Sequence, residues 1–182
     1  TGNQLSEVQK LGILTAKPVL YVCNVDEAAA ATGNAHSARV VTMAAKEGIA
    51  TVVISAAIEA EIAAIDDAAD RTEFLASLGL AKSGLDRVIK AGYELLQLIT
   101  FFTAGPKETH AWTITNGALA AEAAGRIHTD MERGFIRAET ISYDDFVSYD
   151  GEFGARESGK LRLEGRDYAV RDGDVLLFRF NV

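Results

Sequence analysis

The chain has 182 residues, enough for one ordinary domain or two small ones, and its 48% hydrophobic and 24% charged residues are typical of a globular protein. A net charge of −8, spread over both halves, gives no support to a nucleic-acid-binding class, although a local basic face remains open. The single cysteine, Cys23, excludes an internal disulfide, and no apolar run approaches the ~18 residues of a membrane span. Because no signal peptide opens the chain, we expect a cytoplasmic protein, and Thr1 at the start leads us to expect a piece of a longer polypeptide.

The first half of the chain predicts a parallel strand pair. Residues 4–16 carry a rough helical stripe, and Pro18 disfavours helix at the residue before it. The run VLYVCNV that follows is continuously apolar, as in a strand buried on both faces. An alanine-rich segment then predicts a loop and a helix ended by Gly48, and IATVVIS at 49–55 predicts a second buried strand. Strand, helix and strand in this order predict a right-handed βαβ unit.

Helices and then short strands follow. Three helices are expected within residues 56–67, 71–80 and 83–99, the last with a stripe from Leu85 to Leu96. After residue 99 the pattern changes to β-forming runs separated by turn residues, with one short helix across 117–134. The end of the chain predicts strand, turn and strand, with RDGD as the hairpin turn. The predicted fold class is therefore α/β plus α+β, with a β-grasp type of second domain and a boundary near residue 99.

The first candidate site follows the first strand. In Asn24–Glu27, an amide and two carboxylates leave the carboxyl end of a parallel strand, where open α/β sheets bind their ligands. An Asn side chain can pair with a purine edge, and a carboxylate can accept hydrogen bonds from ring N–H groups. The alternative is a polar turn that closes the strand with its carboxylates in water.

The second candidate site is the end of the second strand. The small residues Ser55, Ala56 and Ala57 would let a flat ring lie close to the backbone, with the amide of Ala56 or Ala57 facing it. The alternative is a strand-to-helix turn in which Ser55 caps the following helix.

Other candidates carry little chemistry. His36, His110 and His128 lack metal-ligand spacing, so no metal site is predicted. Cys23 lies inside an apolar strand and is expected to be an inert core residue. Asp66, Asp67 and Asp70 are typical of a solvated helix end, and no G-x-x-x-x-G-K-[ST] motif that could cradle phosphates is present. These residues alone therefore do not support nucleotide hydrolysis, and no catalytic residue is predicted.

Two long segments resemble one family. LTAKPVLYVCNVDE at 14–27 and the stretch from 100 to 146, followed by DGDVLLFRFNV at the end, closely resemble the carboxyl-terminal half of YchF, the Obg-like ATPase family. The block AAGRIHTDMERGFIRAE at 123–139 resembles the core of a TGS domain, a β-grasp module. The resemblance extends from about Leu5 to Val182.

The resemblance implies a domain plan. Residues 1–16 would be the end of a helical coiled-coil arm, residues 17–99 the last part of a P-loop NTPase domain, and residues 100–182 the TGS domain. The intact protein would bind and hydrolyse ATP, or GTP, with Mg²⁺, whereas this chain lacks the P-loop and should be inactive with no cofactor bound.

The resemblance also assigns a role to the first strand end. In related GTPases an N-K-x-D motif reads guanine, whereas this family has N-x-x-E, here Asn24, Val25, Asp26 and Glu27. It implies that Asn24 faces the purine N7/N6 edge, that the Val25 carbonyl meets adenine N6, and that Ser55, Ala56 and Ala57 line the other side of the base. ATP is then favoured or both nucleotides are accepted, and Asp26 keeps guanine open as an alternative.

The family association with ribosomes implies RNA as a partner, with no membrane and no DNA sequence specificity. The candidate RNA-facing residues of the second domain are Arg126, Arg133, Arg137, Arg156, Lys160, Arg162 and Arg166. His128 and Asp130 are expected to belong to a turn capped by Thr129 or Asp130. Because acidic residues are interspersed among these arginines, a solvated mixed surface is the alternative, and a non-enzymatic RNA- or protein-binding module remains the rival to the enzyme.

Overall fold

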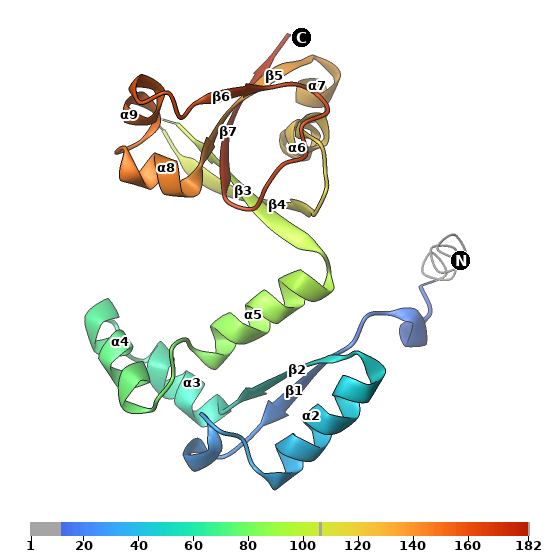
Figure 1. Cartoon of the computed structure of the whole chain (residues 1–182), viewed down its shortest axis with the longest axis vertical. Helices are drawn as coiled ribbons and strands as arrows, with labels where there is room; N and C mark the ends of the chain where they lie inside the picture. The colour runs from blue at the N-terminus through green and yellow to red at the C-terminus, as the bar shows by residue number, and fades with distance from the viewer. Residues whose placement is uncertain (1–11, 106, 182) are drawn as a thin grey trace. The chain divides into compact units, whose positions relative to one another are not determined.

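A computed structural model describes residues 12–105 and 107–181, so that most of the predicted helix at 4–16 lies outside the described residues. The chain forms two compact units, Thr1–Leu96 and Gln97–Val182, each described by itself below (Figure 1). The expected α/β architecture followed by α+β is confirmed. None of the helices in the described ranges is long and apolar enough to cross a membrane.

The first unit is built on two parallel strands. β1 (Leu20–Asn24) pairs with β2 (Ala50–Ile54), with Asn24 opposite Ile54. A short 3-10 helix, η1 (Leu14–Ala16), precedes β1. A second 3-10 helix, η2 (Glu27–Ala29), and the long helix α2 (Ala35–Glu47) lie between β1 and β2 in the sequence. The predicted βαβ unit is therefore present.

Local capping fixes the ends of α2. The Asn34 side chain accepts hydrogen bonds from the backbone N–H groups of His36 and Ser37, and the Ser37 hydroxyl accepts one from the Asn34 N–H. Gly48 ends the helix with φ +69°, a left-handed conformation that glycine adopts without a Cβ penalty. The predicted end of this helix is confirmed.

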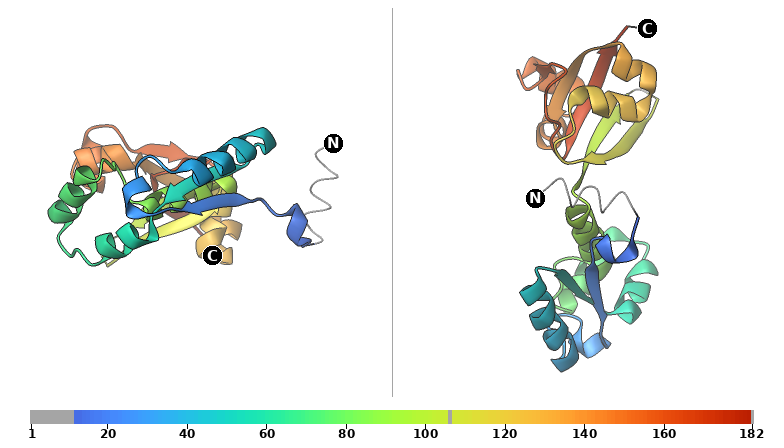
Figure 2. Two further views of the ribbon diagram at one scale, coloured as in Figure 1. Left: turned by 90° about the horizontal axis from the view of Figure 1, so that it is seen from below. Right: turned by 90° about the vertical axis from the view of Figure 1, so that its right-hand side faces the viewer.

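Three further helices complete the first unit: α3 (Ala56–Ala63), α4 (Ala68–Ser77) and α5 (Gly84–Leu95). α2 and α5 both pack on the strand pair: Gly84 at the start of α5 lies against Ile54, and Gly33 just before α2 lies near Val53, the neighbouring residue on the other face. Figure 2 shows this unit from two further sides. The first residue of α5 is held by the Glu59 carboxylate, which accepts hydrogen bonds from the N–H groups of Gly84 (2.7 Å) and Leu85 (3.0 Å). Ile58 and Ile62 of α3 pack with Phe74 and Leu75 of α4 in a small core.

The second unit is a five-stranded mixed sheet. Its strands are β3 (Leu98–Ala104), β4 (Thr109–Thr115), β5 (Phe135–Ser142), β6 (Arg162–Glu164) and β7 (Asp174–Phe180). They lie in the order β4-β3-β7-β5-β6, with β3 and β7 parallel and the other pairs antiparallel. This is the β-grasp arrangement, in which a helix follows the first hairpin and the last strand, β7, lies beside the first strand, β3.

The core of the second unit lies between this sheet and α6 (Ala120–Ile127). Four alanines of α6 are buried, which lets the helix approach Phe101 of β3 and Phe178 of β7 closely. The two phenyl rings meet edge to face at a centroid distance of 6.0 Å.

Two details of the predicted second domain were wrong. The helix expected across 117–134 is divided, because His128 has an extended backbone (φ −158°) and begins a separate helix, α7 (Thr129–Arg133). The final strand-turn-strand is not a hairpin, because β5 lies between β6 and β7. The Arg171 N–H instead donates to the buried Asp174 carboxylate, which closes the RDGD turn at the start of β7.

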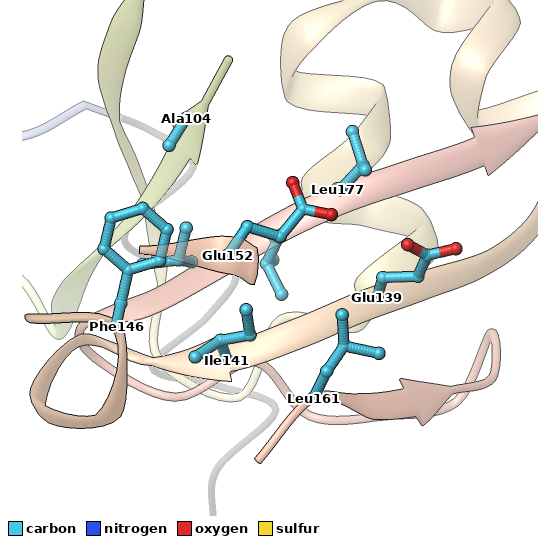
Figure 3. A pocket seen from close by; sticks show the side chains of 9 residues that line it. Ala104, Glu139, Ile141, Phe146, Glu152, Leu161 and Leu177 are labelled. Atoms are coloured by element: carbon cyan, nitrogen blue, oxygen red, sulfur yellow. The ribbon is translucent and has the colours of Figure 1, made fainter. Parts of the chain in front are cut away.

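The face of the sheet opposite α6 is partly covered by two helices that the sequence pattern did not predict, α8 (Tyr143–Ser148) and α9 (Glu152–Glu157). A hollow remains between them and the sheet, lined by Ile141, Phe146 and Leu161 among others, with Glu139 and Glu152 beside it (Figure 3). Its free interior has room for about one water molecule at most, so it is a packing gap rather than a ligand pocket.

Beside this hollow, the buried carboxylate of Glu139 is surrounded by three arginine side chains. We call these four residues (Glu139, Arg137, Arg156 and Arg179) the Glu139 cluster. Glu139 is only 7% exposed. Arg179 binds it through Nε (3.0 Å) and Nη2 (3.2 Å), Arg156 through Nη2 (3.1 Å), and Arg137 lies 3.6 Å away. These contacts, led by the hydrogen bond from Arg179, hold the pKa of Glu139 below its ordinary value of 4.5.

The substitution Gly134→Ala is predicted to destabilise the second unit. A Cβ at Gly134 would overlap the backbone carbonyl of Asn181, which is not free to move because the Asn181 N–H donates to the Gly134 carbonyl (2.9 Å). We expect a loss of about 3 kcal/mol in the free energy of unfolding, followed by the fluorescence of Trp112, the single tryptophan. Gly165→Ala, in the same unit with open space for a Cβ, is the control. Equal stability of the two variants would contradict this packing.

The substitution Glu139→Gln is predicted to destabilise the same unit by about 2 kcal/mol at pH 7, because it leaves the arginines without their anion. Since folding lowers the pKa of Glu139, its contribution is present above the unfolded pKa and is lost as the pH falls through the folded value. The difference from the unmodified protein should therefore shrink below pH ~4. Glu152→Gln, which changes a half-buried carboxylate whose ion pair is with Arg156, should cost less than ~1 kcal/mol. A difference that persists unchanged to pH ~2 would contradict the assignment.

Candidate functional site

The ends of the two parallel strands are joined by the Asn24 side chain. Its Oδ1 accepts a hydrogen bond of 2.9 Å from the backbone N–H of Ala56, the first residue of α3. The adjacent Val25 N–H donates to the Ile54 carbonyl at 2.8 Å and extends the strand pairing by one step. The first and second candidate segments of the sequence are therefore parts of one place in the structure.

This contact fixes the direction of the Asn24 amide. An Asn side chain has one acceptor oxygen and one NH₂ group with two donors. Because the oxygen faces the Ala56 N–H, the NH₂ group is directed away from that contact and is available to an acceptor outside the sheet. Purine N7 is such an acceptor, whereas a donor group of the base could not pair with this NH₂ group.

The residues after Asn24 differ in exposure. Val25 is buried, whereas Asp26 and Glu27 are exposed. Asp26 lies at the position before η2, and its side chain makes no capping hydrogen bond. The exposure of both carboxylates is also what the alternative of a polar turn in water expects. The Glu27 carboxylate lies in the first turn of η2 at the same end of β1.

The Ser55 hydroxyl is the unusual polar group of this place. Ser55 is 2% exposed, and its Oγ has no hydrogen-bond partner among the described residues. Its backbone is at the N-cap position of α3, but its side chain does not cap the helix. An unsatisfied buried hydroxyl costs stability, and a water or ligand that met it would offset this cost.

Ala56 and Ala57 are both exposed, in keeping with the expectation of small residues at a surface. One part of that expectation changes. The amide of Ala56 or of Ala57 was expected to face a ring. The Ala56 N–H is already bound by Asn24, which leaves the Ala57 N–H as the amide of this pair that could face a ligand.

The basic residues predicted to face RNA divide into two groups. Arg133 pairs with Asp130, Lys160 with Asp145, Arg162 with Glu164 and Asp174, and Arg166 donates to the Glu132 carbonyl; Arg126 lies exposed on α6. Arg137 and Arg156 instead belong to the Glu139 cluster. The third arginine of this cluster, Arg179, was not among the residues predicted from the sequence. Because side chains alternate between the two faces of a strand, Arg179 lies on the same face of β7 as Leu177, and this spacing could have indicated it.

Arg162 belongs to a structural network. Its Nη2 donates to the Tyr168 hydroxyl (3.2 Å), which donates in turn to the buried Asp174 carboxylate (2.8 Å). Burial and this hydrogen bond raise the pKa of Tyr168 to about 12. The network fixes the loop before β7 and leaves Arg162 with little free charge.

The remaining candidates are placed apart. His36 is exposed at the start of α2, and His110 lies against the Trp112 ring on β4. His128, rather than Thr129 or Asp130, caps α7 by accepting from the Asp130 N–H, and Asp67 caps α4. Cys23 is half-buried in β1. Within residues 12–105 and 107–181, no three His, Cys, Asp or Glu side chains are grouped to hold a metal ion.

Comparison with known proteins gives consistent matches. A family model described as "YchF-GTPase_C: Protein of unknown function (DUF933)" matches residues 98–181. The chain is 53% identical over 182 residues to the "Ribosome-binding ATPase YchF" of Escherichia coli O157:H7, covering all of this chain and 50% of that protein. It is 50% identical over 184 residues to the protein of the same name from Bacillus subtilis, again covering 50% of it.

A solved structure agrees with these matches. The YchF GTPase of Schizosaccharomyces pombe superimposes with a TM-score of 0.83 at 30% identity, covering 98% of this chain and 48% of that one. A GTP-binding protein from Pyrococcus horikoshii shares the fold at 21% identity, with a TM-score of 0.62. The chain thus spans about half the length of the relatives that it matches. The chain is thus similar over its whole length to YchF proteins, and its residues 98–181 match the model of their carboxyl-terminal family.

Proposed function

We propose that this chain is the carboxyl-terminal part of a ribosome-associated nucleotide-hydrolysing protein, and that the joined ends of β1 and β2 hold the purine base of ATP. The observation that carries the proposal is the Ala56 N–H to Asn24 Oδ1 hydrogen bond, since it leaves the Asn24 NH₂ as a donor for purine N7. The buried, unpaired Ser55 hydroxyl at the same place supports it.

The residues after Asn24 decide which base is preferred. A guanine-reading motif has lysine and aspartate where this chain has Val25 and Glu27. In the proposed complex the Val25 carbonyl accepts from adenine N6, which guanine cannot match because it carries an oxygen there. Ser55, Ala56 and Ala57 line the other side of the ring. Asp26, which is exposed beside Glu27, is the one residue through which GTP binding would be retained.

The phosphate-binding parts of the enzyme lie outside this sequence in the proposal. No P-loop motif is present in the 182 residues, so Mg²⁺ and the β- and γ-phosphates are held by residues that precede Thr1 in the intact polypeptide. We therefore expect residues 12–181 to supply base contacts, and the chain alone to be inactive.

The first unit has the surface of an incomplete domain. Two parallel strands alone rarely form a stable sheet, since parallel sheets are normally covered on both faces. Large apolar side chains remain exposed on β1, α2 and α5, namely Val22, Val41, Met43, Leu85 and Ile89. This supports the proposed plan in which residues 17–99 complete a larger nucleotide-binding domain, residues 1–16 end a helical arm and residues 100–182 form a TGS domain.

We further propose that the TGS domain docks the protein on the ribosome in the cytoplasm; the relatives named ribosome-binding ATPases support the ribosome as the partner. The rival is a non-enzymatic RNA- or protein-binding β-grasp module. The two are distinguished by ATP hydrolysis in the intact polypeptide, since a non-enzymatic module has none.

The variant Asn24→Asp separates base binding from folding. A carboxylate still accepts from the Ala56 N–H but has no donor for purine N7, so we expect ATP affinity of the intact protein to fall about tenfold with unchanged thermal unfolding. Asn24→Ala removes both contacts and should also lower the unfolding free energy by about 1 kcal/mol. Calorimetric titration and circular dichroism measure the two effects. Wild-type ATP affinity in Asn24→Asp would refute the proposed base contact.

Base preference is tested on the unmodified intact protein. ATP should bind at least as tightly as GTP, because Val25 and Glu27 replace the residues that read guanine. Titration of both nucleotides with Mg²⁺ present gives the comparison. GTP binding about tenfold tighter than ATP would contradict the assignment of Val25 and Glu27.

A further inference from the structure

We propose that the Glu139 cluster is the surface through which the second unit contacts the phosphate backbone of RNA. The inference rests on the proposed ribosome docking and names the residues that perform it. It adds Arg179 to the candidates and removes most of the others, because only Arg137, Arg156 and Arg179 combine exposure with a fixed arrangement around one carboxylate.

The charge distribution points to this place. The chain carries a net charge of −8, so a polyanionic partner is repelled overall and needs a local positive surface. Around Glu139, three guanidinium groups face one buried carboxylate, and Glu152 adds a second carboxylate at Arg156. The cluster therefore keeps a positive excess, whereas Arg162 is matched by Glu164 and Asp174 and Arg133 by Asp130.

The strand register supplies a second argument. Arg137 on β5 and Arg179 on β7 are directly opposite each other in the antiparallel pair. Like charges at opposed positions destabilise a sheet, so this pair is costly for folding alone. Glu139, two residues after Arg137 on the same face, offsets that cost and holds Arg179 by a two-point contact. The arrangement holds two guanidinium groups side by side at the surface of the sheet.

The arginines keep donors for a partner. Each guanidinium has five N–H donors, and their side chains are about half exposed: 49% for Arg137, 52% for Arg156 and 48% for Arg179. The contacts with Glu139 use Nε and Nη2 of Arg179 and Nη2 of Arg156, while Arg137 lies beyond hydrogen-bond distance of Glu139. Planar, forked donors held in place match phosphate oxygens and lose little entropy on binding.

The shape of the surface favours a nucleic-acid backbone over an acidic protein segment. Protein partners bind through apolar or aromatic anchors that fill pockets. The hollow beside Glu139 and Glu152 has room for about one water molecule, so it cannot receive such an anchor (Figure 3). A phosphodiester chain needs positive charge and donors but no pocket.

The test uses the intact protein and the double variant Arg137→Gln/Arg156→Gln, which leaves the two-point contact of Arg179 with Glu139 in place. The matched control is Arg126→Gln/Arg171→Gln, which removes two charges from the same unit outside the cluster. Binding to purified ribosomes, to an oligouridylate and to polyglutamate is measured over about 50–200 mM salt. Unfolding followed by Trp112 fluorescence verifies that both variants are folded.

The cluster variant should bind ribosomes and oligouridylate at least about tenfold more weakly than the control. The slope of log K against log salt for oligouridylate should become shallower by about 1.4, two phosphate contacts at ~0.7 each. Equal binding by the cluster variant and the control would overturn the inference while the ribosome docking stands. If the cluster variant lost binding to polyglutamate but kept its binding to oligouridylate and ribosomes, the partner of the cluster would be an acidic protein segment and not RNA. Absence of ribosome binding in the unmodified protein would overturn the proposed docking itself.

Discussion

The hydrogen bond from the Ala56 N–H to Asn24 Oδ1 is the contact on which the candidate base site depends. It links the end of β1 to the first turn of α3, and so places two segments more than thirty residues apart at one position. Because a side-chain amide has distinct donor and acceptor ends, engaging the oxygen inside the protein commits the NH₂ group to the outside. One local contact therefore sets both the geometry and the polarity of the site.

In the second unit, too, one side chain fixes the position of other polar groups, but here it is a buried carboxylate that holds arginine side chains. The buried Glu139 carboxylate brings together guanidinium groups from three elements, β5, α9 and β7. A buried anion is costly unless it is paired, and here the pairing arginines remain accessible from solvent. The same carboxylate thus stabilises the sheet and arranges donors on its surface, which connects the acid stability of this unit to its proposed RNA contact.

Much of the fold was predictable because it is encoded locally. Continuous apolar runs located β1 and β2, and Gly48 marked the end of α2 through its left-handed backbone. The short helices α8 and α9 were missed since six residues show no clear period, and β6 was paired with the wrong strand because its contact with β5 is long-range. The site residues followed from a motif, but the occupied Ala56 N–H and the role of Arg179 depend on tertiary contacts that no spacing reveals.

The most direct test of the base site is nuclear magnetic resonance of the ¹⁵N-labelled intact protein titrated with ATP and Mg²⁺. The proposed complex predicts that the Asn24 side-chain NH₂ resonances move on binding, because they gain a purine acceptor. The Ala56 backbone amide should remain hydrogen-bonded, with slow exchange before and after ATP is added. Saturable ATP binding seen elsewhere in the spectrum, with the Asn24 NH₂ unchanged, would contradict the account.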